Sequence, residues 1–164
     1  MESNRLGQGI DVHPLVKGRP LVLAGVEIPY QYGLDGDTDG DVLTHAIMDA
    51  LLGALALGDL GTYFSSDQPD VVGARSVTLL GQVNDMIRSH GYRIANIDTT
   101  VVAEAPKLRP YVPMMTVQLA EVLGLESAQV SVKATTTDHL GAMGRQEGIM
   151  AIAVVLLMKQ SSGS

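Results

Sequence analysis

A run of alternating aspartates that leads into an apolar helix pattern constrains this chain more than any other segment. Residues 34–59 read LDGDTDGDVLTHAIMDALLGALALGD, with aspartate at positions 35, 37, 39 and 41. Asp41 suits a helix N-cap, because a carboxylate accepts hydrogen bonds from the free N–H groups of a first helical turn. The pattern therefore predicts an acidic loop over residues 29–41 and a helix that begins near Val42 and ends within 58–61.

Asp11, His13 and His45 are candidate metal ligands. Asp11 and His13 fall in a strand predicted over residues 5–13, where alternate side chains point to the same side. His45 lies early in the predicted helix and shares a face with Asp49. Two imidazoles and one carboxylate suit Zn²⁺ or a similar divalent cation, and they leave one coordination position open. Histidines so far apart in sequence can equally be unrelated, so both interpretations stay open here.

Two other polar segments have a structural as well as a functional interpretation. The aspartate run fails as a calcium loop, because Val42 and Met48 stand where glycine and a bidentate glutamate are needed. A solvated loop whose last aspartate caps a helix is the simpler interpretation. The segment KATTTD, residues 133–138, offers three hydroxyls for phosphate oxygens and Asp138 for a hard cation. Threonines are also ordinary strand residues, which explains the same segment equally well.

The rest of the chain predicts mixed helices and strands. A hairpin is expected over residues 21–28, with Ala24-Gly25 as its turn, and helices over 76–89 and 113–123. Further strands are expected over 92–104, 130–135 and 149–158, and loops over 64–75 and 136–148. This order favours a mixed sheet with helices packed on one face. The 164 residues predict a single domain over residues 1–159, followed by a linker-like tail over 160–164.

Composition narrows the classes of partner. The net charge of −7 argues against nucleic acid. The sequence has no cysteine, which excludes disulfides and thiolate metal ligands. Its apolar runs are too short to span a bilayer, and residues 1–25 lack the pattern of a signal peptide. We therefore expect a soluble, cytoplasmic protein that binds neither nucleic acid nor a membrane.

Taken together, the polar segments resemble one enzyme family. Six segments follow the order and spacing of 2-C-methyl-D-erythritol 2,4-cyclodiphosphate synthases, roughly over residues 5–159. They are GIDVH, IPYQYGL, DGDVLTHAIMDALLGALALGDLG, AEAPKL, VKATTTDHLG and GRQEGI. The resemblance implies an α/β sandwich that forms a homotrimer with active sites between subunits. It also implies a phosphorus–oxygen lyase of the non-mevalonate isoprenoid pathway. That enzyme converts 4-diphosphocytidyl-2-C-methyl-D-erythritol 2-phosphate to the 2,4-cyclodiphosphate and CMP.

The resemblance also implies roles for single residues. Zn²⁺ would be held by Asp11, His13 and His45, and Mg²⁺ or Mn²⁺ by Asp138 together with the substrate diphosphate. Thr136 matches the threonine that polarises the β-phosphate, and Asp37 occupies a second catalytic position. Residues 103–109 match a cytidine-binding loop given by the adjacent subunit, and Arg145 and Glu147 match a pair near the trimer axis. The implied substrate-binding residues are Asp11, His13, Asp37, Thr38, Asp59, Leu60, Gly61, Phe64, Ala103, Ala105, Pro106, Lys107, Leu108, Arg109, Thr135, Thr136, Thr137, Asp138, Ala142 and Arg145.

Several residues depart from the family pattern. Asp37 stands where the family has a histidine that contacts substrate phosphate, and Thr38 replaces a serine. Two like unit charges at about 4 Å cost roughly 1 kcal/mol in bulk water and roughly 4 kcal/mol at an effective dielectric of 20. Asp138 replaces a glutamate, and Arg75 replaces an aspartate that would cap the next helix. With the SSGS tail, these departures leave an alternative, an engineered trimeric scaffold with impaired catalysis.

Overall fold

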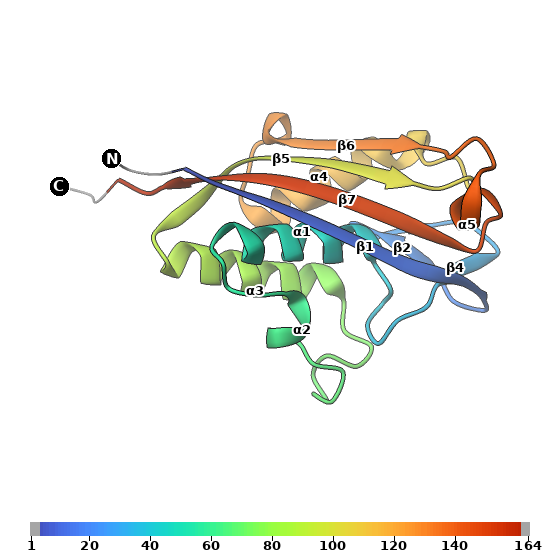
Figure 1. Cartoon of the computed structure of the whole chain (residues 1–164), viewed down its shortest axis with the longest axis horizontal. Coiled ribbons are helices and arrows are strands. Elements are labelled where there is room, and N and C mark those ends of the chain that lie inside the picture. Colours follow the sequence, from blue (N-terminus) through green and yellow to red (C-terminus); the bar gives the residue numbers. More distant parts are fainter. Residues whose placement is uncertain (1–3, 162–164) are drawn as a thin grey trace.

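A five-stranded sheet runs the length of the molecule, and helices lie on one of its faces (Figure 1). This computed structural model describes residues 4–161. The strand order is β4-β1-β7-β5-β6, with all neighbours antiparallel except β5 and β6, which are parallel. The strands are β1 (Arg5–Lys17), β4 (Tyr32–Leu34), β5 (Tyr92–Val102), β6 (Val130–Thr135) and β7 (Gly148–Lys159). The predicted mixed sheet with helices on one face is confirmed.

Three long helices bury the apolar face of the sheet. They are α1 (Val42–Ala54), α3 (Ser76–Ser89) and α4 (Val112–Leu123), and α1 is buried along almost its whole length. The smaller elements are the hairpin β2 (Leu21–Leu23) and β3 (Val26–Ile28), the turns η1 (Arg109–Tyr111) and η2 (Ser127–Gln129), and the short helices α2 (Leu60–Tyr63) and α5 (Gly141–Gly144). No helix among residues 4–161 has both the length and the apolar character needed to cross a membrane.

The α1 helix sits directly on the backbone of β1, because two glycines of that strand have no side chain in the way. A Cβ atom at Gly9 would lie 2.0 Å from the carbonyl oxygen of Ala46, and one at Gly7 would lie 1.9 Å from that of Ala50. Real Cβ atoms do not come so close to backbone oxygens. This contact fixes the distance between α1 and β1. It also fixes the distance between the side chains of β1 that follow Gly9 and the side chains of α1 that face them.

We expect Gly9→Ala to lower the free energy of unfolding by roughly 1–3 kcal/mol or more, because the methyl group meets helix backbone that cannot rotate away. The midpoint of urea unfolding measures this. Gly81→Ala in α3 is the matched control, since a Cβ there meets nothing within 4 Å, and alanine is the better helix former. If Gly9→Ala unfolds at the same urea concentration as the parent, the close approach of α1 to β1 is wrong.

Most predicted elements are confirmed, including the hairpin turn at Ala24-Gly25, the helix over 76–89 and the end of α4 at Gly124. The acidic loop, however, contains β4, which is held by pairing with the far end of β1. The helix after Asp41 ends at Ala54, short of the predicted bound, because Ala56 turns the chain with a φ of 56°.

The predicted loop over 136–148 contains the short helix α5. Three residues of the predicted tail, 162–164, lie outside the described residues. The division into a domain over 1–159 and a tail stays a prediction.

Candidate metal centre and active site

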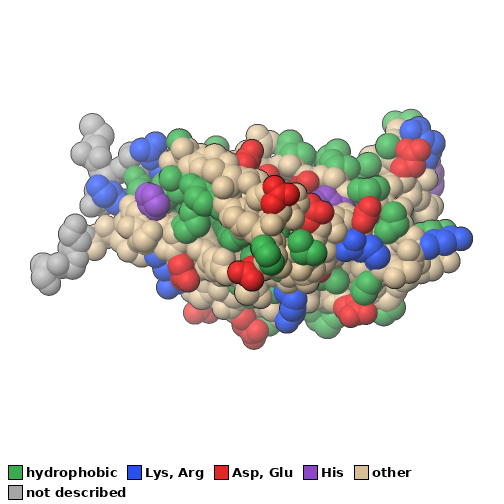
Figure 2. Space-filling model, turned by 90° about the horizontal axis from the view of Figure 1, so that it is seen from below, with side chains coloured by type: hydrophobic (Ala, Val, Ile, Leu, Met, Phe, Trp, Pro, Cys, Tyr) green, Lys and Arg blue, Asp and Glu red, His purple; other side chains and the backbone are tan. Residues whose placement is uncertain are grey.

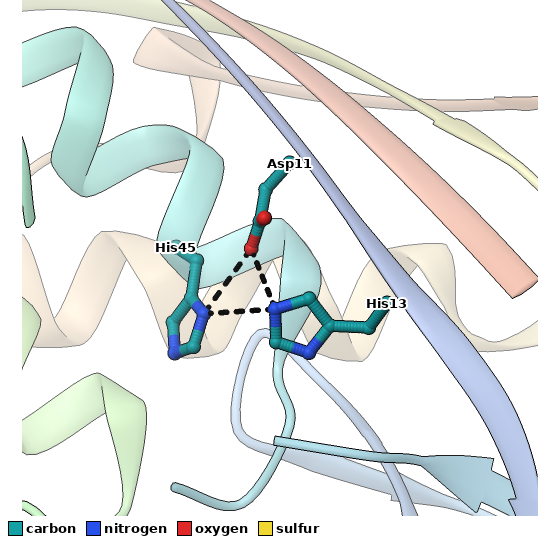
Figure 3. Close-up of side chains that lie close together, drawn as sticks. All are labelled: Asp11, His13 and His45. Atoms are coloured by element: carbon teal, nitrogen blue, oxygen red, sulfur yellow. Dashed lines mark hydrogen bonds and ion pairs between the residues drawn. The ribbon is translucent and has the colours of Figure 1, made fainter. Parts of the chain in front are cut away.

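Asp11, His13 and His45 bring their polar atoms together where β1 passes the first turns of α1 (Figure 3). One carboxylate oxygen of Asp11 lies 2.8 Å from His13 Nε2 and 3.2 Å from His45 Nδ1, and these two nitrogens are 3.3 Å apart. The three side chains come from two elements that the glycine contact holds together. The prediction that these three residues are neighbours is confirmed.

The donor set fits a divalent cation. Two ring nitrogens and a carboxylate oxygen point at one another, and all three ligand atoms lie within 4.8 Å of each other. Lone pairs that face each other in this way repel unless a proton or a cation lies among them. A cation bound by two imidazoles and one carboxylate also keeps a coordination position for a further oxygen, as catalytic sites do. The three residues therefore form a candidate metal site.

The electrostatics of the group agree with this interpretation. Burial raises the pKa of Asp11, but hydrogen bonds and charge interactions with His13 and His45 outweigh burial and leave that pKa well below its usual range. Burial lowers the pKa of His13, but the Asp11 carboxylate outweighs it and the net pKa is raised. Asp11 thus stays ionised as a ligand. A proton competes with a cation for His13, so we expect cation affinity to fall as the pH falls.

Asp41 anchors the helix that carries His45. Its fully buried carboxylate accepts hydrogen bonds from Thr44 N (3.0 Å) and Thr44 Oγ1 (2.7 Å), and from Ala24 N (2.9 Å) and Gly25 N (2.8 Å) of the hairpin turn. The predicted helix cap is confirmed, but Asp41 does not lie in a solvated loop. Burial raises its pKa, and the four donors offset the cost of desolvation.

The three candidate ligands open into a cavity of about 380 Å³, which we call the acidic cavity. Five carboxylates line it, from Asp11, Asp35, Asp37, Asp49 and Asp59. Figure 2 shows acidic side chains gathered in the middle of the molecular face that is seen from below Figure 1. The predicted site residues that line this cavity are Asp11, His13, Asp37, Thr38, His45, Asp59, Leu60, Gly61 and Phe64. So many carboxylates around one cavity favour a ligand that arrives with cations.

A second group of predicted residues lines a separate hollow of about 160 Å³ at the ends of β5 and β6, which we call the threonine hollow. Its predicted members are Ala103, Pro106, Lys107, Leu108, Arg109, Thr135 and Thr136. The fold therefore brings the segments AEAPKL and KATTT together. This agrees with the prediction that both segments bind the same substrate. Five predicted site residues line neither space: Ala105, Thr137, Asp138, Ala142 and Arg145. Asp138 also lies apart from the three clustered ligands.

Two charged side chains, Arg19 and Glu104 of the predicted cytidine-binding loop, hold the loops around these spaces. Arg19 donates to Asp35 Oδ1 (2.9 Å) and to the carbonyl oxygens of Gly36 (3.0 Å) and Thr38 (2.8 Å). Glu104, whose side chain is 4% exposed, accepts from the backbone N–H groups of Thr137 (3.0 Å) and His139 (3.0 Å). The hydrogen bond from His139 is the main cause that lowers the pKa of Glu104. The partners of both side chains are distant in sequence, so no local pattern marks these contacts.

Comparisons with known proteins agree with the arrangement. The YgbB family matches residues 4–158. The 2-C-methyl-D-erythritol 2,4-cyclodiphosphate synthase of a Nostoc species is 57% identical over 156 residues, which covers 95% of this chain and 94% of that protein. The enzyme of the same name from Synechococcus elongatus is 55% identical over 159 residues, or 97% of this chain and 99% of that protein.

Solved structures show the same fold. The IspF of Plasmodium falciparum, in a CDP complex, superposes with a TM-score of 0.85 at 30% identity and covers 98% of this chain and 99% of that one. The bifunctional IspDF from Campylobacter jejuni gives a TM-score of 0.93 at 40% identity, over 97% of this chain and 43% of that longer chain. The chain therefore belongs to the YgbB family, whose members it matches in sequence and fold over nearly its whole described length.

Proposed function

We propose that this chain is a 2-C-methyl-D-erythritol 2,4-cyclodiphosphate synthase. It closes 4-diphosphocytidyl-2-C-methyl-D-erythritol 2-phosphate to the 2,4-cyclodiphosphate and releases CMP. The observation that carries the proposal is the convergence of Asp11, His13 and His45 on one wall of the acidic cavity. Relatives that share more than half of its residues over almost their whole length bear that enzyme's name.

The reaction requires two phosphates of one molecule to meet. An oxygen of the 2-phosphate attacks the β-phosphorus, the new P–O bond forms, and the bond from the β-phosphorus to the CMP oxygen breaks. Asp11, His13 and His45 would hold a divalent cation, which we assign as Zn²⁺, and this cation would supply charge neutralisation at the phosphate oxygens. The chain's own residues orient the flexible substrate, which removes much of the entropic cost of ring closure.

The threonine hollow supplies the groups suited to the other end of the substrate. Lys107 and Arg109 carry positive charge there, and Thr135 and Thr136 carry hydroxyls. These groups match the needs of a nucleoside diphosphate, and relatives of this fold include structures with bound CDP. We assign Thr136 as the group that polarises the β-phosphate. Asp138, which lies outside the hollow, would hold a second cation, Mg²⁺ or Mn²⁺, together with the substrate diphosphate.

The division of the site into two spaces supports assembly between subunits. Within one chain the acidic cavity and the threonine hollow have separate linings. We infer that the chain forms a homotrimer in which the acidic cavity of one subunit faces the threonine hollow of the next. The adjacent subunit then gives the cytidine-binding loop, residues 103–109, to each site.

Turnover of 4-diphosphocytidyl-2-C-methyl-D-erythritol 2-phosphate with Zn²⁺ and Mg²⁺ present tests the proposal. We expect CMP and the cyclic diphosphate in equal amounts, followed together by ³¹P NMR. CMP without the cyclic product would indicate simple hydrolysis and contradict the assignment. A folded protein that binds Zn²⁺ and CDP but forms neither product would instead favour the non-catalytic scaffold.

A further inference from the structure

The second ring nitrogen of His45 is held from the side away from the candidate metal site. While Nδ1 faces Asp11 and His13 (Figure 3), Nε2 lies 3.0 Å from Ser76 Oγ and 3.1 Å from Thr38 Oγ1. His45, Ser76 and Thr38 are all buried, and Ser76 has no exposed surface. Ser76 is the first residue of α3, so a residue of a different helix touches the ring.

Ser76 is in turn tied to an aspartate of the acidic loop. Its hydroxyl donates to Asp39 Oδ1 at 2.5 Å, and its backbone N–H donates to Asp39 Oδ2 at 3.1 Å. The N–H of Asp41 also donates to Asp39 Oδ1, at 3.2 Å. Asp39 therefore holds a fixed orientation, and it caps α3, where Arg75 makes no side-chain cap.

The hydrogen-bond distances favour one assignment of protons. An ionised carboxylate has no proton to donate, and the Ser76 hydroxyl lies 2.5 Å from Asp39 Oδ1 but 3.3 Å from Thr38 Oγ1, so its single proton points to Asp39. The oxygen of Ser76 is then placed to accept from an N–H on His45 Nε2, and Thr38 Oγ1, which accepts from the N–H of Gly40, offers that N–H a second acceptor. Nδ1, on the other side of the ring, is left with its lone pair facing Asp11 and His13, as a metal ligand requires.

We propose that Asp39 and Ser76 form a positioning relay that fixes His45 in the tautomer that binds the cation through Nδ1. The inference rests on the proposed metal site and extends it to two residues that touch neither cation nor substrate. Partners of this kind fix the ring and its tautomer, and their loss typically weakens metal binding 10–100-fold. The proposed relay also gives a role to Asp39, which the sequence pattern predicts to be a residue of a solvated loop.

A simpler interpretation is that Ser76 and Asp39 only cap α3. The cap uses the backbone N–H of Ser76, whereas the relay uses its hydroxyl, so Ser76→Ala removes the relay and keeps the cap. Asp39→Asn is the second variant. It keeps an acceptor oxygen for the Ser76 N–H but removes the charge, and its amide can donate to Ser76 and reverse the hydroxyl. Thr78→Ala, at an exposed position of the same helix, is the matched control.

Two measurements separate the interpretations. In competition with a chromophoric chelator, we expect the dissociation constant for Zn²⁺ to rise about 10–100-fold in Ser76→Ala and Asp39→Asn, and to stay unchanged in Thr78→Ala. In the metal-free protein, long-range ¹H–¹⁵N NMR should show His45 protonated at Nε2 in the parent and as mixed tautomers in the two variants. Urea unfolding of each variant monitors the helix cap.

The relay is overturned if Ser76→Ala and Asp39→Asn keep the parent's Zn²⁺ affinity and tautomer, or if the metal-free parent carries its proton on Nδ1. A parent without measurable Zn²⁺ affinity would refute the proposed metal site instead. The tautomer of the metal-free protein would still decide the relay, so the two failures are distinguishable.

Discussion

His13→Ala is expected to lower turnover at least about a thousandfold and to remove tight cation binding. His13 gives one of three ligand atoms, and its Nε2 lies 2.8 Å from Asp11 and 3.3 Å from His45 Nδ1. Charge neutralisation by a bound cation contributes several kcal/mol to phosphate chemistry, and each 1.36 kcal/mol is tenfold in rate. Cation content after dialysis and the rate of CMP release measure the two effects.

Removal of the bound cation from the parent protein with a chelator tests the same site without a substitution. We expect a chelator to abolish turnover in the parent and added Zn²⁺ to restore it, while His13→Ala stays inactive at the same Zn²⁺ concentration. His90→Ala, at the exposed C-terminal end of α3, is the control for loss of a histidine. Turnover of His13→Ala within tenfold of the parent would mean that the three residues do not hold the catalytic cation.

Local sequence pattern predicted the candidate ligands because each lies in a regular element with a definite periodicity. Asp11 and His13 are two apart on a strand, so both face α1, and Asp41 marks the start of the helix that carries His45. The pattern did not show that strand and helix lie side by side. That neighbourhood depends on Gly7 and Gly9, whose meaning appears only when the helix backbone is in place.

The supporting contacts could not be predicted, because they join residues that are far apart in sequence. Asp39 meets Ser76 37 positions away, Arg19 meets the acidic loop 16 to 19 positions away, and β4 exists only through pairing with β1. The roles of Thr136, Asp138 and Arg145 came from family resemblance alone. They remain predictions, since position in the fold does not test what a side chain binds.

The substitution Asp37→His is expected to raise kcat/KM about ten- to a thousandfold. The Asp37 side chain is exposed and lines the acidic cavity, while its carbonyl oxygen is held by the N–H of Gly73 at 2.7 Å. Its carboxylate thus faces the space assigned to phosphate, which four other carboxylates also line. Removing one like charge at about 4 Å recovers roughly 1–4 kcal/mol, depending on the local dielectric.

Asp37→His can act in two ways, by removing the repulsion between a carboxylate and the substrate phosphate or by adding a hydrogen bond from the imidazole. The variant Asp37→Asn distinguishes the two effects. It removes the charge without an imidazole, so a gain equal to that of Asp37→His would assign the whole effect to repulsion. Asp70→His makes the same change of charge at an exposed residue outside the cavity lining and should leave kcat/KM unchanged.

Added salt should raise the parent's kcat/KM more than that of Asp37→His, because salt screens a partly exposed charge. No gain in Asp37→His would show that the carboxylate does not oppose the substrate. The acidic cavity would then admit phosphate together with a cation that Asp37 itself helps to bind, and Asp37→Asn would weaken turnover instead of improving it.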